Sequence, residues 1–580
     1  MALASIDPRN TNTLWCSVMV ETLARLGLTH AIVSPGSRST PLTLALSRHS
    51  QIETLPVLDE RSAGFFALGL ARQQGRPVVL VCTSGSAGAH YLPALIEAHE
   101  SEIPLLVLTA DRPPEMRACS SGQTIDQQKL FGDHIAAYLE LGVPEASLER
   151  LRYVRQTLAH AWNRALGPVA GPVHLNVPFR DPLAPIAEPA VPSAAELIDD
   201  AFFAHLTPEP VAKTQATYWQ RANTARGLMV AGPASPRDPR AYAAAVGRLA
   251  AASGWPILAD VLSTLRTHRP EEGHVVTTYD LILRDERTAQ ALLPRQVICL
   301  GGWPTSKVLR AFIERSQAEI LMVSLSDQNR DALHGKTRQI YAAVEALAIQ
   351  GSALPEESYQ RQWIEAEKAG RQALDSMVQR QPGFEGAMAW TLAQALPHGT
   401  PFFVAGSMPV RDVEYFWPAN RGEQHFAFNR GANGIDGTLS TALGWTHRNR
   451  PGVLLTGDLA LLHDTNGALI LPKFKGSLTI VLINNRGGGI FEHLPIASFD
   501  PPFEDYFATP QDIDFARWAA TYGIEHVDVR SETHLADLVR TLPLSGVRLL
   551  EIKTNRKADA AYRKREFARL AAEVGRQLNL

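Results

Sequence analysis

The stretch GDLALLHDTNGALILPKFKGSLTIVLINN, residues 457–485, decides how the surrounding chain folds. A short apolar run at residues 453–455 precedes it, and a second run at 478–483 lies near its end. Both runs are leucine-rich or β-branched and end at Gly or Asn, which is typical of buried parallel strands. Because residues 460–471 carry helical spacing of apolar side chains, the stretch predicts a β-α-β unit.

Two polar residues, Asp458 and Asn485, each follow one of these predicted strands. In parallel sheets, ligands bind beyond the carboxyl ends of the strands. A carboxylate, an amide oxygen and the free carbonyls of the following Gly487-Gly488-Gly489 suit Mg²⁺, which completes its octahedron with phosphate oxygens and water. A Gly-Asp pair alone is also consistent with a capped turn. The Asn pair and the glycines favour a metal–diphosphate site.

Length and composition restrict the class of protein. A chain of 580 residues is too long for one core and predicts about three domains. With 45% hydrophobic residues, 20% charged residues and a net charge of −3, it has the composition of an ordinary globular protein. No nucleic acid or membrane partner is expected from this charge balance, so an anionic substrate must be bound by local arginines.

The cysteines and the N-terminus predict a cytoplasmic location. The four cysteines lack metal-ligand spacing, which favours reduced thiols: Cys16, Cys82, Cys119 and Cys299. Asp7 and Arg9 stand where a signal peptide would need an apolar region. No apolar run approaches the ~20 residues of a membrane-spanning helix.

The order of apolar runs predicts three α/β domains. Residues 12–185 alternate strand and helix patterns, which is typical of a doubly wound parallel sheet. The predicted strands are His30–Val33, Val78–Cys82, Leu105–Thr109 and Val173–Val177, followed in the next section by Leu228–Ala231, Pro256–Ala259, Val297–Leu300 and Ile320–Val323. A Pro- and Ala-rich linker is predicted at 186–210, and a helical connector at 356–381. The predicted domains cover residues 1–185, 186–355 and 356–580.

Several turns after these strands contain candidate binding residues. Ser37 and Arg38 lie in SPGSRSTP, a polar loop before a helix, where hydroxyls, a helix start and a guanidinium can hold a carboxylate. Arg112 follows a strand, and Gln123 and Lys307 occupy later turns. Each of these side chains, taken alone, is equally consistent with a helix cap or a solvated surface position.

Glu60 stands at a strand-to-helix junction in the segment LDERSAG. A lone glutamate at such a position is expected to cap the helix. The alternative is an acid–base role, since a carboxyl group shielded from water can have a raised pKa suited to proton exchange. The residues alone leave both interpretations open.

The pattern GD followed by NN resembles the signature of the thiamine diphosphate-dependent decarboxylase and acetolactate synthase superfamily. The resemblance implies three doubly wound domains: pyrimidine-binding, central and diphosphate-binding. It implies that Asp458, the Asn485 side chain and the Gly487 carbonyl bind Mg²⁺, with Mn²⁺ as an alternative ion. It also implies that Glu60 contacts the pyrimidine nitrogen of the cofactor and promotes its imino tautomer. Leu459 departs from the usual Gly-Asp-Gly but leaves the metal ligands in place.

Six segments together resemble one branch of this superfamily, the 2-succinyl-5-enolpyruvyl-6-hydroxy-3-cyclohexene-1-carboxylate synthases of menaquinone and phylloquinone biosynthesis. They are SPGSRSTP, DERS, ADRPPE, GSMPVRD, NRGANGIDG and NNRGGGIF. The family decarboxylates 2-oxoglutarate and adds the succinyl carbanion equivalent to isochorismate. Charged hydrogen bonds of ~1.5–3 kcal/mol each suit arginines to these carboxylates.

The resemblance also assigns roles to individual residues. It implies that Ser407, Arg411 and Arg430 hold the succinyl carboxylate, and that isochorismate is bound by Ser37, Arg38, Arg112, Gln123 and Lys307. The implied cofactor contacts are Glu60, Ser84, Gly85, Ser407, Met408, Gly434, Ile435, Gly457, Asp458, Leu459, Asn485, Gly487, Ile490 and Phe491. Gly406 stands where relatives can have Asn, so that side-chain contact is absent. Ile435 and Phe491 are equally consistent with core positions.

The family implies a homodimer, or a dimer of dimers, whose sites combine Glu60 of one chain with Asp458 of the other. Another thiamine diphosphate enzyme acting on a 2-oxo acid, such as an acetolactate synthase, is the alternative within enzymes. It would need fewer arginines, since pyruvate has no distal carboxylate. A non-catalytic relative is the alternative from another class, and the retention of Glu60, Asp458 and Asn485 argues against it.

Overall fold

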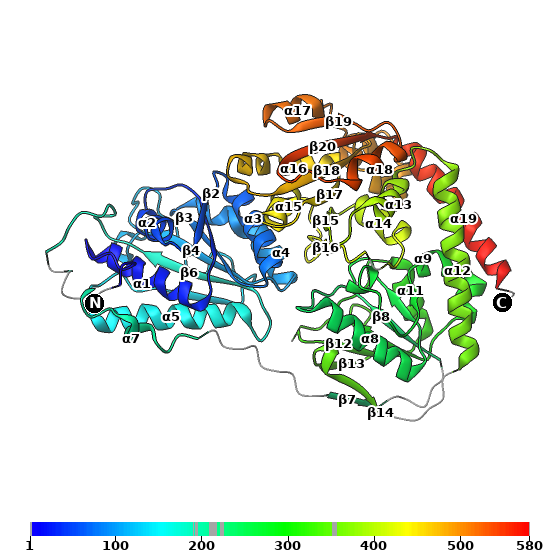
Figure 1. The fold of residues 1–580 in the computed structure, drawn as a ribbon, viewed down its shortest axis with the longest axis horizontal. Helices are drawn as coiled ribbons and strands as arrows, with labels where there is room; N and C mark the ends of the chain where they lie inside the picture. The colour runs from blue at the N-terminus through cyan, green and yellow to red at the C-terminus, as the bar shows by residue number, and fades with distance from the viewer. Residues whose placement is uncertain are drawn as a thin grey trace. The chain divides into compact units, whose positions relative to one another are not determined.

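The computed structural model describes residues 3–189, 191, 195–207, 217–220, 226–326, 328–350, 356–420 and 422–578. Its internal contacts divide the chain into two compact units. The first unit comprises Met1–Ala212, Asn429–Asn449 and Leu461–Gly476, and the second comprises Lys213–Phe428, Arg450–Ala460 and Ser477–Leu580. The elements of both units are labelled in Figure 1.

The first unit contains a six-stranded parallel sheet, counted within the described residues. Its strand order is β2-β1-β3-β4-β6-β5. The strands are β1 (His30–Val33), β2 (Glu53–Pro56), β3 (Val78–Cys82), β4 (Leu105–Asp111), β5 (Ala137–Glu140) and β6 (Pro172–Pro178). The central strands β3, β4 and β6 are buried along their whole length, as expected for a sheet covered on both faces.

The second unit contains two further six-stranded parallel sheets among the described residues. One has the order β10-β9-β8-β11-β12-β13, and the other has the order β16-β15-β17-β18-β20-β19. The strands of the first are β8 (Gly227–Ala231), β9 (Ile257–Ala259), β10 (Val275–Val276), β11 (Gln296–Leu300), β12 (Glu319–Ser324) and β13 (Lys336–Tyr341). Those of the second are β15 (Pro401–Val404), β16 (His425–Ala427), β17 (Gly452–Gly457), β18 (Ser477–Asn484), β19 (Glu525–Asp528) and β20 (Gly546–Lys553).

Helices alternate with these strands, as the sequence predicts. In the first unit they are α1 (Thr11–Leu26), α2 (Thr40–Arg48), α3 (Glu60–Gln74), α4 (Leu92–Glu100), α5 (Leu148–Leu166), α7 (Asp200–Phe203) and α15 (Thr438–Thr446). In the second unit they are α8 (Pro239–Ser253), α9 (Tyr279–Ile282), α10 (Glu286–Ala291), α11 (Lys307–Ser316), α12 (Glu357–Arg380), α13 (Glu385–Ala395), α14 (Met408–Phe416), α17 (Phe515–Thr521), α18 (Glu532–Arg540) and α19 (Arg556–Gln577). The long helices α12 and α19 run side by side (Figure 1).

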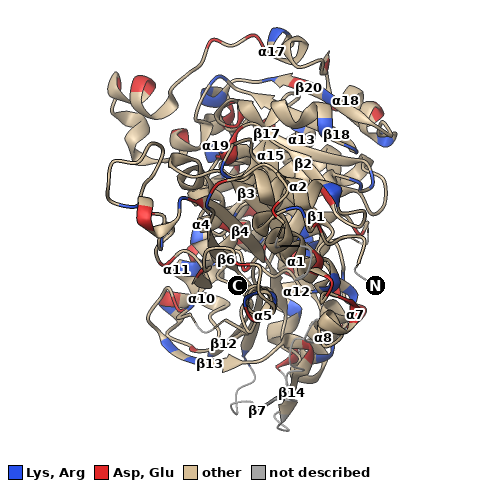
Figure 2. Cartoon of the chain, turned by 90° about the vertical axis from the view of Figure 1, so that its left-hand side faces the viewer, with Lys and Arg blue, Asp and Glu red and all other residues tan. Residues whose placement is uncertain are grey.

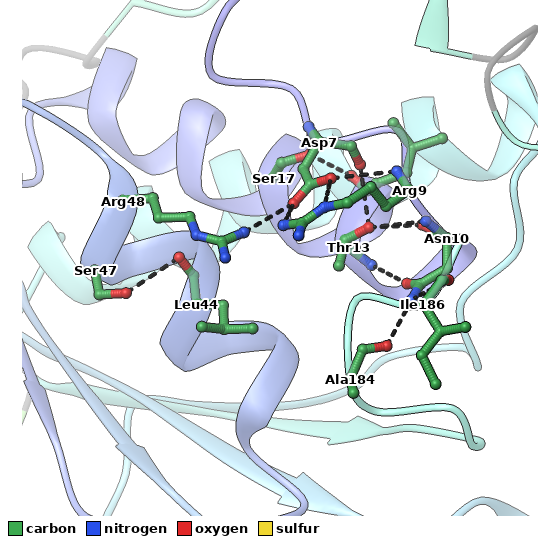
Figure 3. Close-up of polar contacts among 11 residues, drawn as sticks. Asp7, Arg9, Asn10, Thr13, Ser17, Leu44, Ser47, Arg48, Ala184 and Ile186 are labelled. Carbon is green, nitrogen blue, oxygen red and sulfur yellow. Dashed lines mark hydrogen bonds and ion pairs between the residues drawn. The ribbon is translucent and has the colours of Figure 1, made fainter. Parts of the chain in front are cut away.

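The start of α1 is tied to the end of the first α/β section (Figure 3). Asn10 caps the helix, because its side chain accepts from the Thr13 backbone N–H while the Thr13 hydroxyl accepts from the Asn10 N–H. Its Nδ2 also donates to the carbonyls of Ala184 (2.8 Å) and Ile186 (3.1 Å). One side chain therefore both begins the first helix and fixes the chain as it leaves the sheet.

Helices α3 and α15 of the first unit pack against each other through a reciprocal pair of glycines. A Cβ atom on Gly69 would lie 2.2 Å from the Thr441 carbonyl oxygen, three residues before Gly444. A Cβ atom on Gly444 would lie 2.1 Å from the Phe66 carbonyl oxygen, three residues before Gly69. The two backbones thus touch directly, and neither position has room for a side chain.

Most predicted strands and the β-α-β unit are confirmed, but the helix predicted at residues 460–471 is α-helical only as far as His463. The chain forms α16 (Asp458–His463) and then a 3₁₀ helix at Thr465–Lys473. The break falls at Asp464, whose buried carboxylate accepts from the Ser440 N–H (2.6 Å) and hydroxyl (3.0 Å). The α-helix therefore ends where the Asp464 side chain bonds to Ser440, 24 residues earlier in the chain. Parts of the predicted linker, residues 190, 192–194 and 208–210, lie outside the described residues.

Basic and acidic residues are interspersed along the chain (Figure 2), in agreement with the small net charge. Across the described ranges, no helix combines the length and apolar character needed to cross a bilayer.

Candidate active site

Asp458 lies where β17 ends, and its carboxylate is buried, with 3% of the residue exposed. Oδ1 accepts from the Leu459 N–H at 2.9 Å, and Oδ2 accepts from the Gly487 N–H at 2.8 Å. Burial raises the pKa of Asp458 to about 6 despite these hydrogen bonds. The Asp458 carboxylate therefore links the ends of β17 and β18, and a neighbouring cation would stabilise its charged form.

Asn485 follows β18 and is 8% exposed. Its Nδ2 donates to Glu385 Oε1 at 3.0 Å, whereas its Oδ1 is buried and has no hydrogen-bond partner within the described part of the chain. Buried polar atoms are almost always satisfied, so an unpaired amide oxygen calls for an explanation. A ligand at Oδ1 supplies one.

The glycines after Asn485 form a turn that other residues would not fit. Gly487 has φ 137°, and a Cβ atom there would lie 2.5 Å from the Ala508 carbonyl oxygen. The Gly487 carbonyl accepts from the Gly489 N–H at 2.9 Å, which leaves it a second lone pair. The Gly487 N–H is therefore fixed on Asp458, and the Gly487 carbonyl oxygen keeps a free lone pair two residues after Asn485.

These three residues fit a hard divalent cation. The donor set is one carboxylate, one amide oxygen and one carbonyl oxygen, the ligand types that Mg²⁺ prefers. The unpaired Asn485 Oδ1 and the desolvated Asp458 carboxylate are the groups that such an ion would compensate. The structure thus brings together the three residues predicted from the sequence as metal ligands.

Ser407 and Arg411, predicted to hold a carboxylate, also lie together. The Arg411 Nη1 donates to the Ser407 carbonyl at 2.6 Å, and burial lowers the pKa of Arg411. Ser407 has φ 65°, a left-handed conformation that costs of the order of 1–3 kcal/mol for a non-glycine residue and concentrates at functional sites. It precedes α14, at the carboxyl end of β15.

Four other predicted residues of the second unit have less decisive positions. Lys307 is exposed at the first position of α11. Met408 is buried at the start of α14, while Ile490 and Phe491 are half-buried in the turn after β18. The Phe491 ring packs edge-on against Phe507 with 5.9 Å between centroids. These positions do not test the predicted contacts of the four residues with cofactor or substrate, which stay predictions.

Glu60 begins α3, but it does not cap this helix. The adjacent Asp59 does so, because its Oδ1 accepts from the Arg61 and Ser62 N–H groups at 2.9 and 3.4 Å. No hydrogen bond or ion pair involves the Glu60 carboxylate among the described residues. The half-buried Glu60 instead lines a cavity of about 460 Å³ with Leu58, Asp59, Arg61, His90, Asn466 and Leu469. Its carboxyl group is therefore available to a ligand.

Four predicted residues meet at the carboxyl ends of β3 and β4. Arg112 donates through Nη1 to the Ser84 hydroxyl and, at 2.7 Å, to the Gln123 carbonyl. The Gln123 Nε2 donates to the Ser84 carbonyl at 2.9 Å. Gly85, with φ 87°, is fixed by its N–H, which donates to Gln127 Oε1 at 2.9 Å. Gln127 is a buried organising residue that sequence analysis missed.

The loop after β1 contains the other two predicted residues of this unit. Arg38 is buried and donates to the Phe179 carbonyl at 3.1 Å, while Ser37 is exposed. Desolvation, followed by the charge of Arg38, lowers the pKa of Arg112. A Cβ atom on Gly36 would lie 2.2 Å from Thr83 Cβ, so this loop packs closely on the turn after β3.

The loop that contains Arg430, Gly434 and Ile435 is anchored by Glu97 of α4. The Glu97 carboxylate accepts from the N–H groups of Gly431 (2.9 Å) and Ala432 (2.8 Å). Gly434 and Ile435 are half-buried. Glu97 is only 3% exposed and was not predicted from the sequence.

The structure thus brings ten of the predicted residues into two groups. One, in the second unit, contains Asp458, Asn485 and Gly487, together with Ser407 and Arg411, which follow the neighbouring strand β15. The other, in the first unit, contains Arg38, Ser84, Gly85, Arg112 and Gln123. Of the residues that were missed, Gln127 and Glu385 each form a hydrogen bond with a member of these groups, and Glu97 holds the loop that contains Arg430. Among these three, Glu97 alone left a signal in the sequence, as a charged residue inside the apolar helix pattern of α4.

Comparisons with known proteins agree with this arrangement. Residues 16–131 match the thiamine pyrophosphate enzyme N-terminal TPP binding domain, residues 200–404 match the middle domain, and residues 405–552 match the C-terminal TPP binding domain. Benzoylformate decarboxylase from Polynucleobacter necessarius, at 16% identity, superposes with a TM-score of 0.66 over 93% of this chain and 98% of that one. That likeness supports the fold alone.

Two relatives are similar over nearly their whole length. The 2-succinyl-5-enolpyruvyl-6-hydroxy-3-cyclohexene-1-carboxylate synthase of Trichodesmium erythraeum (strain IMS101) is 49% identical over 96% of this chain and 98% of its own. The synthase of the same name from Synechococcus sp. (strain JA-3-3Ab) is 50% identical over 98% of both.

The fold, the three domain matches and the site define the class, which is that of the thiamine diphosphate-dependent enzymes. Within this class, the chain belongs to the 2-succinyl-5-enolpyruvyl-6-hydroxy-3-cyclohexene-1-carboxylate synthase family.

Proposed function

We propose that the protein converts 2-oxoglutarate and isochorismate into 2-succinyl-5-enolpyruvyl-6-hydroxy-3-cyclohexene-1-carboxylate and CO₂, a step of menaquinone or phylloquinone biosynthesis. The observation that carries this proposal is the identity of about half of all residues with synthases of that name over nearly the full chain. When bound, thiamine diphosphate supplies the electron sink for loss of CO₂. The protein binds and orients the reactants and positions the proton donor.

The proposed proton-exchanging group is Glu60, acting at the pyrimidine nitrogen of the cofactor. Its carboxyl group is supported in this role by its position on the cavity and by Asp59, which caps α3 in its place. A positioned acid–base group contributes roughly 10²–10⁴-fold to a rate.

The proposed substrate contacts follow the distribution of charge. Arg411 and Arg430, with Ser407, hold the distal carboxylate of 2-oxoglutarate, and Arg38 and Arg112, with Ser37, Gln123 and Lys307, face isochorismate. Burial supports Arg411 and Arg38 in these roles, because a guanidinium removed from water binds a carboxylate more strongly than an exposed one.

We also propose that Asp458, Asn485 Oδ1 and the Gly487 carbonyl bind Mg²⁺, or Mn²⁺ in its place. The ion would neutralise the diphosphate of the cofactor and so fix it at the ends of β17 and β18. The unpaired amide oxygen of Asn485 supports this assignment.

The decisive experiment is mass spectrometry of the product formed from 2-oxoglutarate and isochorismate with thiamine diphosphate and Mg²⁺. The named product is expected in equal amount to the CO₂ released. Pyruvate tests the alternative, because an acetolactate synthase would condense two pyruvate molecules. Acetolactate formation without use of isochorismate would overturn the proposed reaction.

We further propose a homodimer, or a dimer of dimers, in which each site takes Glu60 from one chain and the metal-binding turn from the other. Inactive Glu60→Gln and Asp458→Asn chains, refolded together, should then restore about 25% of wild-type activity. Half the randomly paired dimers are mixed, and each has one intact site, as closed two-fold symmetry requires. An inactive mixture that contains mixed dimers would contradict the shared site.

Two coarser predictions accompany this function. The boundaries at residues 185 and 355 remain predictions, which limited proteolysis would test. A cytoplasmic location also remains a prediction, and cell fractionation would test it.

A further inference from the structure

The Asn485 side chain meets a second buried side chain, Glu385, which the proposed function does not use. Glu385 is the first residue of α13 and is 2% exposed. Its Oε1 accepts from Asn485 Nδ2 at 3.0 Å and from the Thr554 hydroxyl at 2.7 Å. The contact therefore fixes the nitrogen end of the amide whose oxygen end is unpaired.

We infer that Glu385 is a positioning residue, which holds the Asn485 amide so that Oδ1 and not Nδ2 is offered to the metal ion. The inference rests on the proposed Mg²⁺ site and adds a residue to it. An asparagine amide has two ends of nearly equal size, and turning it over replaces an acceptor by two donors. A cation is attracted by Oδ1 and repelled by the NH₂ group, so the orientation decides whether the residue is a ligand.

Glu385 can enforce this orientation because Oε1 accepts hydrogen bonds. Oε1 is the accepting oxygen in this structure, since it accepts from both Asn485 Nδ2 and the Thr554 hydroxyl, and in the carboxylate form it has no proton to donate. A turned amide would place Asn485 Oδ1 against Glu385 Oε1, and two acceptors cannot share a proton that neither carries. The contact therefore favours the orientation in which Oδ1 remains free.

Glu385 is itself held from two other elements. Its backbone N–H donates to Asp559 Oδ1 of α19 at 3.0 Å, and Thr554 follows β20. The Thr554 N–H donates to the Asn484 carbonyl at 3.0 Å, next to the proposed ligand. The helix start and the ends of β18 and β20 are thus locked together, as a precise binding site requires.

A helix-stabilising role does not account for this glutamate. Acidic residues at helix starts are favourable when exposed, where they interact with the helix dipole at little desolvation cost. Glu385 is buried, and burying a carboxyl group is costly. Its oxygen is also used on Asn485 and Thr554 and not on an N–H group of α13.

The test measures Mn²⁺ affinity by electron paramagnetic resonance, with saturating thiamine diphosphate. Glu385→Met, which fills the space without an acceptor, should weaken Mn²⁺ binding about 10–100-fold, the usual effect of removing a partner that orients a metal ligand. Glu385→Gln keeps an acceptor and should retain the affinity. Glu551→Met is the matched control, because buried Glu551 accepts from Nδ2 of the neighbouring Asn484 at 2.7 Å. It should leave the affinity unchanged.

A double-mutant cycle separates positioning from general damage. In an Asn485→Ala background, Glu385→Met should weaken Mn²⁺ binding no further, because its effect passes through the missing amide. Unchanged Mn²⁺ affinity in folded Glu385→Met would overturn the inference, as would equal weakening by Glu551→Met. If Glu385→Met does not fold, loss of affinity in Glu385→Gln overturns it. Failure of Asp458→Ala to weaken Mn²⁺ binding would instead reject the proposed metal site.

Discussion

The sheet of residues 30–178 and the sheet of residues 401–553 have the same topology and different chemistry. Numbered along the chain within each sheet, both have the strand order 2-1-3-4-6-5. The sheet between them in sequence has the order 3-2-1-4-5-6. Each loop that follows a strand of the first sheet therefore has a counterpart after the same strand of the last sheet. The residues of two such loops can be compared directly.

The third and fourth strands show the difference most clearly. In the first sheet they lead to Ser84 and Arg112, which offer hydroxyl and guanidinium donors. In the last sheet they lead to Asp458 and Asn485, which offer oxygen acceptors. The same strand order thus carries hydrogen-bond donors in one sheet and acceptors in the other, so the chemistry lies in the loops and not in the fold.

The largest effect is expected at Glu60, which follows the second strand of the first sheet. We expect Glu60→Gln to bind thiamine diphosphate and Mn²⁺ but to lower kcat by roughly 10²–10⁴-fold, because the amide cannot exchange the proton. Steady-state kinetics measures this loss. Glu53→Gln, at the opposite end of the same strand β2, is the matched control and should keep its kcat. Near wild-type turnover in Glu60→Gln would contradict the assignment.

The first strand of the last sheet leads to Ser407 and Arg411. Their side chains can donate hydrogen bonds, whereas Asp458 and Asn485, after the third and fourth strands, offer acceptors. Arg411→Ala should raise the KM for 2-oxoglutarate about 10–100-fold, the equivalent of one lost charged hydrogen bond of ~1.5–3 kcal/mol. The KM for isochorismate should change far less, since only one substrate loses its partner. Pyruvate should become a relatively better donor. Equal increases in both KM values would reject the specific role.

In both sheets the second strand is followed by a helix, and these two helices, α3 and α15, touch through reciprocal glycines. Gly69→Ala and Gly444→Ala should each lower the free energy of unfolding by ~1–3 kcal/mol, since each new methyl group meets a backbone carbonyl. At a helix position with room for the methyl group, replacing Gly with Ala would instead stabilise the helix by ~0.5–1 kcal/mol. Urea denaturation measures the change. Gly122→Ala, with no atom within 4 Å of the added Cβ, is the control.

The smallest effect is expected at Glu53, at the amino end of β2. Burial alone would raise its pKa, but hydrogen bonds from Arg448 and Lys475 and the charge of His447 hold the pKa at about 2. The interactions of the Glu53 carboxylate therefore stabilise the folded chain fully above the usual pKa of 4.5. This stabilisation is lost as the pH falls toward 2. Glu53→Gln should cost about 1 kcal/mol or less at pH 7, as partly exposed ion pairs do, and less at acid pH. A cost that does not fall with pH would contradict this.

Much of the fold could be predicted because the strands are buried on both faces and read as continuous apolar runs. His30–Val33 and Val78–Cys82 begin and end as predicted. The strand ends then located Asp458, Asn485 and Arg112, since parallel strands share their carboxyl edge. Local sequence was therefore sufficient to locate a residue wherever burial defined the strand and strand direction defined its carboxyl end.

The remaining features depend on contacts between distant residues. Glu385 meets Asn485 100 residues away, and Glu97 meets Gly431 334 residues away. The break at Asp464 depends on Ser440, so the helical pattern of residues 460–471 was misleading. For Glu60, the structure gives the capping role to the adjacent Asp59, and the acid–base role stays a prediction.

The unpaired oxygen of Asn485 has a consequence for how long the protein survives in a cell. A buried acceptor without a partner costs about 1–3 kcal/mol, and a ligand that satisfies it binds the folded chain in preference to the unfolded one. Free ligand at 100 times its Kd adds ~2.7 kcal/mol to the free energy of unfolding. Since one or two kcal/mol changes cellular abundance several-fold through proteolysis, the proposed Mg²⁺ site would make the amount of this protein depend on the supply of magnesium and thiamine diphosphate.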